Sequence, residues 1–248
     1  MTTSTGSLVG RHCMITGAAS GIGAAIATAF ARAGATLALA DLDADRLGRT
    51  ASDLAGTRHV LDLTTPDAVQ ALIDTEIEQA GRIDVLVNCA GILTEVPLVD
   101  MDVATWQRMI DVDLTSVFLT CRAVVPHMLH AGGGRIINIA SQLGQKGGSG
   151  LTHYSAAKAG VIGFTKALAR EVSARGVLVN AIAPGPITTP LIDGLSPDWK
   201  QAKEAELPLG RFGLPEEVAP TAVLLASHPG GNLYTGQTLG PNSGDVMV

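Results

Sequence analysis

The sequence has few aromatic residues and no excess of basic ones. Aromatic residues make up 3% of its 248 residues, and 17 Lys and Arg stand against 23 Asp and Glu, for a formal net charge of -6. The basic residues are scattered along the chain instead of clustered. Nucleic acids and anionic membranes attract basic patches. We therefore expect neither a nucleic-acid partner nor a membrane partner.

Cysteines and long apolar runs are also scarce. Cys13, Cys89 and Cys121 lie far apart, with no CxxC pair and no neighbouring histidine pair, so the sequence predicts no metal site. No apolar run approaches the roughly 18 residues of a membrane span, and the first residues lack the apolar region of a signal peptide. We expect reduced thiols in the core of a soluble, cytoplasmic protein.

β-rich runs alternate with segments of helical spacing along most of the chain. Apolar residues make up 46% of the sequence, enough for one sizeable core. Several β-rich runs are apolar throughout, as in strands that helices cover on both faces. The alternation predicts a parallel α/β sheet in a single domain over residues 1–248. The expected strands are 12–16, 36–41, 58–63, 83–88, 134–140, 177–183 and 236–240, and helices are expected at 21–34, 66–81 and 215–227.

The alternation stops between about residues 184 and 214. This stretch begins with PGPITTP and contains too much Pro and Gly for one regular element. Long irregular segments of this kind often cover a site. We predict a substrate flap at about residues 186–213.

Three glycines follow the first expected strand, in the sequence TGAASGIG. Gly17, Gly21 and Gly23 would let backbone N–H groups approach a pyrophosphate at the N-terminus of the following helix. Glycines in a turn before a helix also provide positive φ angles without any ligand. The cluster alone leaves both interpretations open.

An acidic residue ends the second expected strand. Asp41 stands eighteen residues after Gly23, close to the distance of about 20 at which an acid binds the ribose hydroxyls of a dinucleotide. Its charge would repel a 2′-phosphate, and Ser20 and Leu42 offer no positive charge to bind one. These residues favour NAD over NADP. The alternative is a carboxylate that caps the next helix.

One of the two tyrosines stands four residues before a lysine. In HYSAAKAG, Tyr154 and Lys158 would share one face of a helix, with Cβ atoms about 5–6 Å apart. An ammonium beside a phenol favours the phenolate, so we expect a lowered pKa for Tyr154. Taken alone, a tyrosine is an ordinary core or surface residue, and Ser141, at the end of the run NIAS, is an ordinary cap.

Five motifs, in this order, resemble those of the short-chain dehydrogenase/reductase family. They are TGAASGIG (16–23), NCAG (88–91), the serine that ends NIAS (138–141), YSAAK (154–158) and NAIAPGPITTP (180–190). The match extends over nearly the whole chain. The resemblance implies a Rossmann-type, doubly wound parallel sheet of about seven strands with helices on both faces. It also implies reversible hydride transfer between NAD and a small-molecule secondary alcohol or ketone.

The resemblance assigns roles to individual residues. Tyr154 would exchange the proton of the substrate alcohol, Ser141 would hydrogen-bond the same oxygen, and Lys158 would tune the phenol and hold the nicotinamide ribose. The cofactor would contact Gly17, Ser20, Gly21, Ile22, Gly23, Asp41, Leu42, Asp62, Leu63, Asn88, Ala90, Gly91, Tyr154, Lys158, Pro184, Ile187 and Thr189. Family members also pair the helices around residues 104–130 and 153–173, which implies a homo-oligomer, a tetramer.

The sequence departs from the family pattern at three places. Asp113 stands where the family usually has Asn, a residue thought to hold a water that links Lys158 to solvent. We expect Asp113 to take part in catalysis with a changed pH profile, the alternative being a substitution without consequence. Cys89 replaces a second Asn and is expected to be a small buried residue. The ending LGPNSGDVMV replaces the frequent Asp-Gly-Gly ending, which puts the family's C-terminal subunit contacts in doubt.

The sequence does not determine which substrate the protein uses. The expected pocket loops carry a mixture of polar, charged and apolar side chains: Gln142, Gln145, Lys146, Leu191 and Trp199. A polyol, sugar, hydroxy-ketone or 3-hydroxyacyl compound would fit. The pattern is similar to 3-oxoacyl carrier-protein reductases, which mostly use NADPH, whereas Asp41 favours NAD. The alternatives are therefore a reductase of that kind, or an NAD-binding sensor or scaffold with impaired turnover.

Overall fold

A parallel sheet forms the centre of the protein in this computed structural model, which describes residues 6–192 and 197–247 without the side chains of Pro197 and Trp199. Within these residues the sheet has seven strands in the order β3-β2-β1-β4-β5-β6-β7. All neighbouring strands are parallel, which confirms the predicted fold class. The strands are β1 (His12–Thr16), β2 (Thr36–Asp41), β3 (Gly56–Val60), β4 (Val85–Asn88), β5 (Gly134–Ile139), β6 (Val177–Ile182) and β7 (Thr238–Leu239).

Most strands lie close to their expected bounds, and β3 differs most. β1 and β4 are buried at every position, because helices cover both faces of the sheet. β3 was expected at 58–63, but its pairing with β2 starts at Gly56 and ends at Val60. Beyond it, Asp62 accepts hydrogen bonds from the N–H and the hydroxyl of Thr64, which turns the chain out of the sheet.

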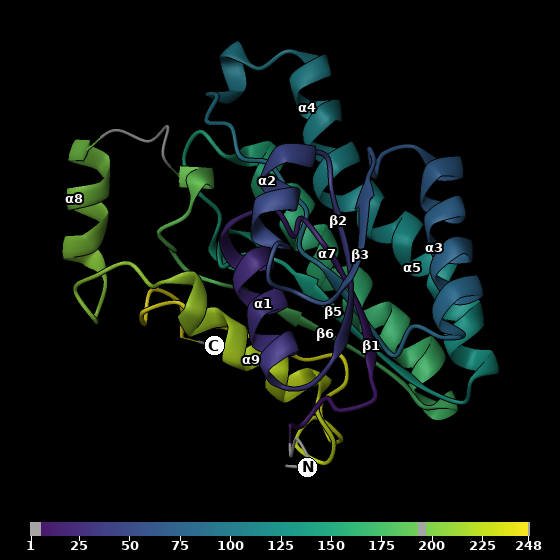
Figure 1. Ribbon diagram of the computed structural model, residues 1–248. Helices are drawn as coiled ribbons and strands as arrows, with labels where there is room; N and C mark the ends of the chain where they lie inside the picture. The colour runs from purple at the N-terminus through teal and green to yellow at the C-terminus, as the bar shows by residue number, and fades with distance from the viewer. Residues whose placement is uncertain (1–5, 193–196, 248) are drawn as a thin grey trace.

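Helices cover the two faces of the sheet in two groups (Figure 1). One group is α1 (Gly21–Arg32), α2 (Ala44–Thr50) and α9 (Pro215–Ala226), and the other is α3 (Pro66–Ala80), α5 (Ser116–His130) and α7 (Thr152–Val172). Each face has its own apolar core, with Phe30 in the first and Val124 in the second. α1, α3 and α9 confirm the three helices expected from the sequence. The other helices and helical turns include α4 (Val103–Ile110), α6 (Leu143–Lys146), α8 (Pro197–Glu206), η1 (Leu98–Asp100), η3 (Ser173–Arg175) and η4 (Pro190–Ile192).

The helical segment expected around residues 104–130 is interrupted near its middle. α4 ends at Ile110 and α5 begins at Ser116, and between them Asp111–Thr115 form a π-helical turn, η2. Turns of this kind occur frequently at functional sites. Here the turn carries Asp113, whose exposed fraction is 0%.

The segment predicted as a flap contains a helix that the sequence pattern did not predict. α8 lies within 186–213, after η4, and most of the Pro and Gly residues stand before or after it. Residues 193–196 of this segment lie outside the described residues. Figure 1 shows α8 at the left edge of the molecule, away from the sheet. A flap role for the segment remains a prediction.

The cysteines follow the sequence-based expectation in part. Cys13 and Cys121 are buried, but Cys89 is only half-buried, because it belongs to the loop after β4 that lines the cavity described below. Among the described residues, no group of three or more His, Cys, Asp or Glu is placed to hold a metal ion. No helix in the same part of the chain is both long and apolar enough to cross a membrane.

Candidate active site

A cavity of about 890 Å³ opens at the carboxyl ends of the strands. Its wall includes residues that end or follow β1, β2, β4, β5 and β6, the edge where open α/β sheets bind ligands. Of the residues predicted for catalysis and for the cofactor, all but Asn88 line this cavity. They are Gly17, Ser20, Gly21, Ile22, Gly23, Asp41, Leu42, Asp62, Leu63, Ala90, Gly91, Asp113, Ser141, Tyr154, Lys158, Pro184, Ile187 and Thr189. Of the residues expected in the pocket loops, Gln142, Lys146 and Leu191 line it and Gln145 does not, while the side chain of Trp199 lies outside the described part of the chain.

Asn88 is buried among other polar side chains instead. Its Nδ2 donates to Asn138 Oδ1 at 2.9 Å, and its Oδ1 accepts a hydrogen bond from the Thr120 hydroxyl at 2.7 Å. These bonds link β4 to β5 and to α5. They satisfy the hydrogen-bonding groups of an amide that is buried inside the fold. The structure does not bring this side chain to the cavity wall with the others.

Close packing accounts for two of the three glycines after β1. A Cβ on Gly17 would lie 2.6 Å from the backbone nitrogen of Ala90, and one on Gly23 would lie 2.1 Å from the Gly17 carbonyl oxygen. Gly21 has a φ of 53°, in the left-handed region. Ser20, the N-cap of α1, makes no capping bond with its side chain. The first turn of α1 therefore keeps N–H groups for an anion, and the loop fits a pyrophosphate.

Asp41 ends β2 and is held beside the glycine loop. Its Oδ2 accepts a hydrogen bond from the N–H of Ala19 at 2.9 Å, and its Oδ1 accepts one from the N–H of Asp43 at 3.0 Å. The alternative of a helix cap is wrong, because Asp43 caps α2. Each Asp41 oxygen has a further lone pair for a ribose hydroxyl. The neighbouring Leu42 is 64% exposed and brings no positive charge.

Asp62 and Leu63 line the cavity beyond the end of β3. The backbone N–H and then the hydroxyl of Thr64 lower the pKa of Asp62 by hydrogen bonding to it. Leu63 is buried in the apolar core behind the wall. The pair thus offers one carboxylate and one apolar surface on the side of the cavity where Asp41 lies.

Lys158, on α7, is a buried cation with an acidic partner. Its Nζ lies 3.1 Å from Asp113 Oδ2 and donates to the Ile139 carbonyl oxygen at 3.1 Å. Burial lowers the pKa of Lys158, but Asp113 and Tyr154 raise it more, so the ammonium form is stabilised. This confirms the expected direction of the effect of a carboxylate at position 113. Asp113 is itself fixed by the Ile92 N–H, which donates to its Oδ1 at 2.8 Å.

Tyr154 stands one helical turn before Lys158, as predicted. The Lys158 ammonium is 5.6 Å from the centre of the phenol ring. Burial raises the pKa of Tyr154, Lys158 lowers it and Asp113 raises it, and the net pKa lies above the ordinary value. The prediction of a lowered phenol pKa is therefore wrong for the protein's own side chains, because burial and the Asp113 charge outweigh the ammonium.

Ser141 stands at the carboxyl end of β5, next to Tyr154. Its side chain lowers the pKa of the Tyr154 phenol, and its Oγ accepts a hydrogen bond from the N–H of Leu143 at 3.1 Å. Ser141 and Tyr154 are both 7% exposed, at the cavity wall. A hydroxyl, a phenol and an ammonium therefore meet at one point of the cavity, with the Asp113 carboxylate behind the ammonium.

Comparison with known proteins agrees with this geometry. A family model described as enoyl-(acyl carrier protein) reductase matches residues 17–244. A solved short-chain type dehydrogenase/reductase from Mycobacterium marinum has a TM-score of 0.93 and 35% sequence identity, with 98% of each chain covered. The chain belongs to the short-chain dehydrogenase/reductase family.

Two relatives of this short-chain dehydrogenase/reductase have names that describe different reactions. The 3-oxoacyl-[acyl-carrier-protein] reductase FabG of Thermotoga maritima is 41% identical over 245 residues, which cover 97% of this chain and 99% of the relative. The 2-dehydro-3-deoxy-L-rhamnonate dehydrogenase (NAD(+)) of Sphingomonas sp. (strain SKA58) is 39% identical over 224 residues, 90% of each chain. As a member of the family, the protein is an oxidoreductase for alcohol and ketone substrates with a nicotinamide cofactor.

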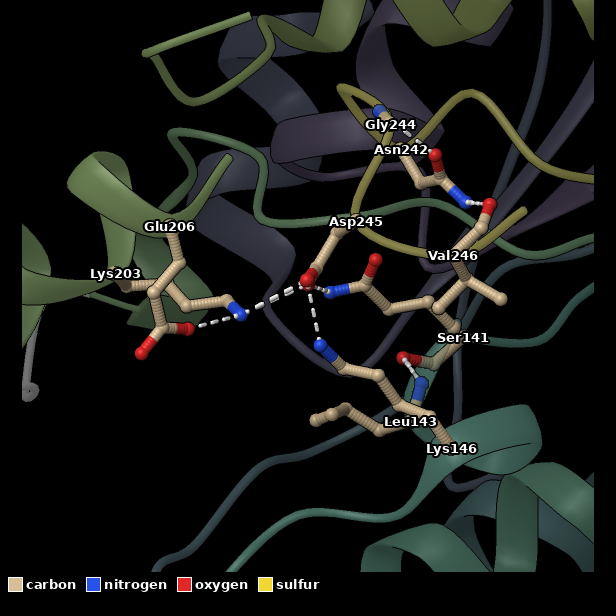
Figure 2. A network of polar contacts seen from close by, with 10 residues as sticks. Ser141, Leu143, Lys146, Lys203, Glu206, Asn242, Gly244, Asp245 and Val246 are labelled. Carbon is tan, nitrogen blue, oxygen red and sulfur yellow. Dashed lines mark hydrogen bonds and ion pairs between the residues drawn. The ribbon is translucent and has the colours of Figure 1, made fainter. Parts of the chain in front are cut away.

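Sequence reasoning missed charged residues on the cavity wall of this short-chain dehydrogenase/reductase. Arg108 of α4 and Lys203 and Glu206 of α8 line the cavity. Figure 2 shows that Lys203 also meets Asp245, a residue of the chain after β7. Because helix α8 was not predicted from the sequence, the positions of its side chains were not predicted either. No local sequence pattern links residue 203 to residue 245.

Proposed function

We propose that the protein transfers a hydride reversibly between NAD(H) and a secondary alcohol or the matching ketone. The observation that carries this proposal is the meeting of Ser141, Tyr154 and Lys158 on the wall of one cavity with the glycine loop and Asp41. Alcohol oxidation needs an acid–base group at the hydroxyl and a dinucleotide site beside it. This cavity provides residues for both.

The cofactor would lie along the carboxyl ends of the strands. The glycine loop would hold its pyrophosphate and Asp41 its adenosine ribose, while Lys158 would hold the nicotinamide ribose. Ile22, Asp62, Leu63, Ala90 and Gly91 would line the adenosine side, and Pro184, Ile187 and Thr189 the nicotinamide side. When bound, NAD supplies the acceptor for the hydride.

Tyr154 would exchange the proton of the substrate hydroxyl. The phenolate accepts this proton in the oxidative direction, and the phenol returns it in the reductive direction. Ser141 hydrogen-bonds the same oxygen and orients it. Lys158 remains an ammonium and favours the phenolate against the effect of burial. Acid–base catalysis of this kind contributes about 10²–10⁴-fold to a rate.

Asp113 would act through Lys158 as a positioning residue. It holds the ammonium from behind while the Ile92 N–H fixes the carboxylate. Its charge opposes the effect of Lys158 on the phenol. We infer that Asp113, in place of the family's usual Asn, sets the pH at which Tyr154 works.

Two observations support NAD as the cofactor. Asp41 places a carboxylate where a 2′-phosphate would be repelled, and neither Ser20 nor Leu42 offsets its charge. The relative from Sphingomonas carries NAD(+) in its name. The relative from Thermotoga supports the alternative of a 3-oxoacyl carrier-protein reductase, a class that mostly uses NADPH.

Asp41→Asn is expected to weaken the preference for NAD. The loss of a charged hydrogen-bond acceptor for the ribose, worth about 1.5–3 kcal/mol, lowers kcat/KM for NAD roughly tenfold to a hundredfold. The NADP-to-NAD ratio of kcat/KM rises, because the repulsion of a 2′-phosphate is removed. Asp43→Asn is the matched control, since it removes a charge two residues away that serves as a helix cap. An unchanged ratio in Asp41→Asn would contradict the assigned role.

A substrate panel tests the proposed function directly. NADH formation by the purified protein is measured with polyols, other secondary alcohols, sugar acids and 3-hydroxyacyl thioesters, with NADP in parallel. Turnover with NAD on an alcohol supports the proposal. Turnover confined to thioesters and NADP supports the carrier-protein reductase, and tight NADH binding without any turnover supports a sensor or scaffold.

We also propose a cytoplasmic homotetramer that forms through α5 and α7. Phe118 on α5 is 45% exposed, which leaves a large apolar side chain on the surface. An added Cβ at Gly163 on α7 would meet nothing within 4 Å, so a second chain has room to approach closely. Light scattering should give the mass of four chains, and Phe118→Asp should lower it. A monomeric unmodified protein would contradict this prediction.

A further inference from the structure

Three segments that are far apart in the sequence meet at one carboxylate (Figure 2). Lys146 Nζ lies 2.6 Å from Asp245 Oδ1, Lys203 Nζ lies 2.9 Å from Oδ2, and Gln142 Nε2 donates to Oδ2 at 2.5 Å. Lys146 belongs to α6, Lys203 to α8, and Gln142 to the loop directly after Ser141. Two ammonium groups and an amide therefore surround a single carboxylate, with hydrogen bonds of the strong, charge-assisted kind.

These donors belong to the wall of the active-site cavity. Gln142, Lys146 and Lys203 line the same cavity as Ser141 and Tyr154. The segment with Gln142 and Lys146 follows Ser141 directly, so it lies on the side where the substrate oxygen would be held. A substrate held by Ser141 and Tyr154 would extend along a wall that carries the ammonium groups of Lys146 and Lys203 and the carboxylate of Glu206.

Lys146 retains capacity to bind a second anion. An ammonium has three donors, and the side chain of Lys146, which is 32% exposed, makes its ion pair with Asp245. Lys203 is 13% exposed and divides its contacts between Asp245 and Glu206. Burial lowers the pKa of Lys203, but Asp245 and Glu206 raise it more. Lys203 is therefore held as a cation, and Lys146 is the lysine of the two that is more exposed at the cavity wall.

We propose that Lys146, supported by Lys203, binds a carboxylate of the substrate, so that the protein acts on hydroxy acids and the matching oxo acids. This proposal rests on the proposed function and names the substrate class. Asp245 shows that a carboxylate fits among these donors. The substrate carboxylate takes the free donors of Lys146, and Asp245 competes with it for the positive charge. Neutral polyols and thioesters have no group that the lysines recognise.

A series of hydroxy acids and their amides tests the proposal. 3-Hydroxybutyrate, 4-hydroxypentanoate and 5-hydroxyhexanoate carry the same secondary alcohol at increasing distance from the carboxylate, and each matching amide lacks the charge. We expect the acid to exceed the amide in kcat/KM by about tenfold or more at the best length. The difference should lie in KM, because it reflects binding away from the reacting carbon. Titration of the protein–NADH complex with each acid and amide, followed by NADH fluorescence, provides a readout without turnover.

Substitutions of Lys146 and Asp245 distinguish recognition of a substrate carboxylate from a purely structural role of these residues. Lys146→Met removes the charge and keeps most of the stem, and we expect the acid to lose about tenfold in affinity while the amide changes by less than about twofold. Arg32→Met, on the exposed side of α1 and away from the cavity wall, is the matched control. Asp245→Asn removes the competing carboxylate and should improve the acid relative to the amide.

The ratio of acid affinity to amide affinity distinguishes substrate recognition by Lys146 from a purely structural role. A ratio in Lys146→Met equal to that of the unmodified protein overturns the proposal, even if both ligands bind more weakly, because the cluster then only holds the three segments together. Turnover of neutral alcohols without any preference for acids overturns it as well and leaves the proposed function intact. Absence of turnover with every alcohol would contradict the proposed function itself.

Discussion

Tyr154→Phe is expected to remove nearly all turnover and to leave NADH binding in place. The variant loses the hydroxyl that exchanges the substrate proton, which should lower both kcat and kcat/KM by about 10²–10⁴-fold. The ring that faces the Lys158 ammonium, 5.6 Å away, is retained, so packing at this point is preserved. Initial rates of alcohol oxidation and a fluorescence titration with NADH measure the two effects separately.

Tyr234→Phe is the natural control, because the chain has two tyrosines. Tyr234 packs against the core on the face of the sheet covered by α1 and α9, and its variant should keep full activity. If Tyr154→Phe kept a rate close to that of the unmodified protein, a different group would have to move the proton. If it lost NADH binding together with turnover, the phenol would act in cofactor binding and not mainly in proton transfer.

Asp113→Ala is expected to destabilise the protein by about 3–5 kcal/mol, because it leaves the Lys158 ammonium buried without its partner. Lys158 is 4% exposed, so little solvent reaches the ammonium to replace the carboxylate. The Ile92 N–H also loses its acceptor. Denaturant midpoints measure the loss, with Asp111→Ala as control. Asp111 lies in the same π-helical turn, but its carboxylate bonds the exposed Gln107 side chain. Equal losses in both variants would contradict the importance of the buried pair.

Asp113→Asn separates the catalytic effect from the structural one. The amide still offers an acceptor to the Ile92 N–H but no longer offsets the Lys158 charge. Because the Asp113 charge raises the pKa of Tyr154, its removal lowers that pKa. The phenolate then forms at lower pH, and the acid limb of the kcat/KM profile for oxidation should move to lower pH. An unaltered profile would show that this side chain takes no part in setting the proton chemistry.

The sequence was sufficient for the sheet and the helices on it, because apolar runs and helical periodicity are local signals. The end of β3 was less predictable, since the turn made by Asp62 and Thr64 stops the strand although the apolar pattern continues. The π-helical turn Asp111–Thr115 gave no signal either, because it changes the backbone path without changing the apolar pattern. Both misses concern backbone hydrogen bonds that composition does not reveal.

The meeting of most of the predicted residues at one cavity was also predictable, whereas their electrostatics were not. Ser141 lies just after β5, and Tyr154 and Lys158 lie on α7, so motif and spacing were enough to predict that they meet. The raised pKa of Tyr154 depends on burial and on Asp113, which comes from a different element. Asn88 ends β4 as expected, but its neighbours Asn138 and Thr120 draw its side chain into the interior. Such effects depend on contacts between distant parts of the chain.

The position of Asp245 after all seven described strands sets an order in which the two ends of the cavity can form during synthesis. A ribosome releases the glycine loop and Asp41 early, and Lys203 and Asp245 late. The adenosine end is therefore built from the first strands to emerge, whereas the three-way contact of Figure 2 has to wait for the chain that follows β7. The part of the wall where Lys203 contacts Asp245 can therefore form only after all seven of these strands have been synthesised.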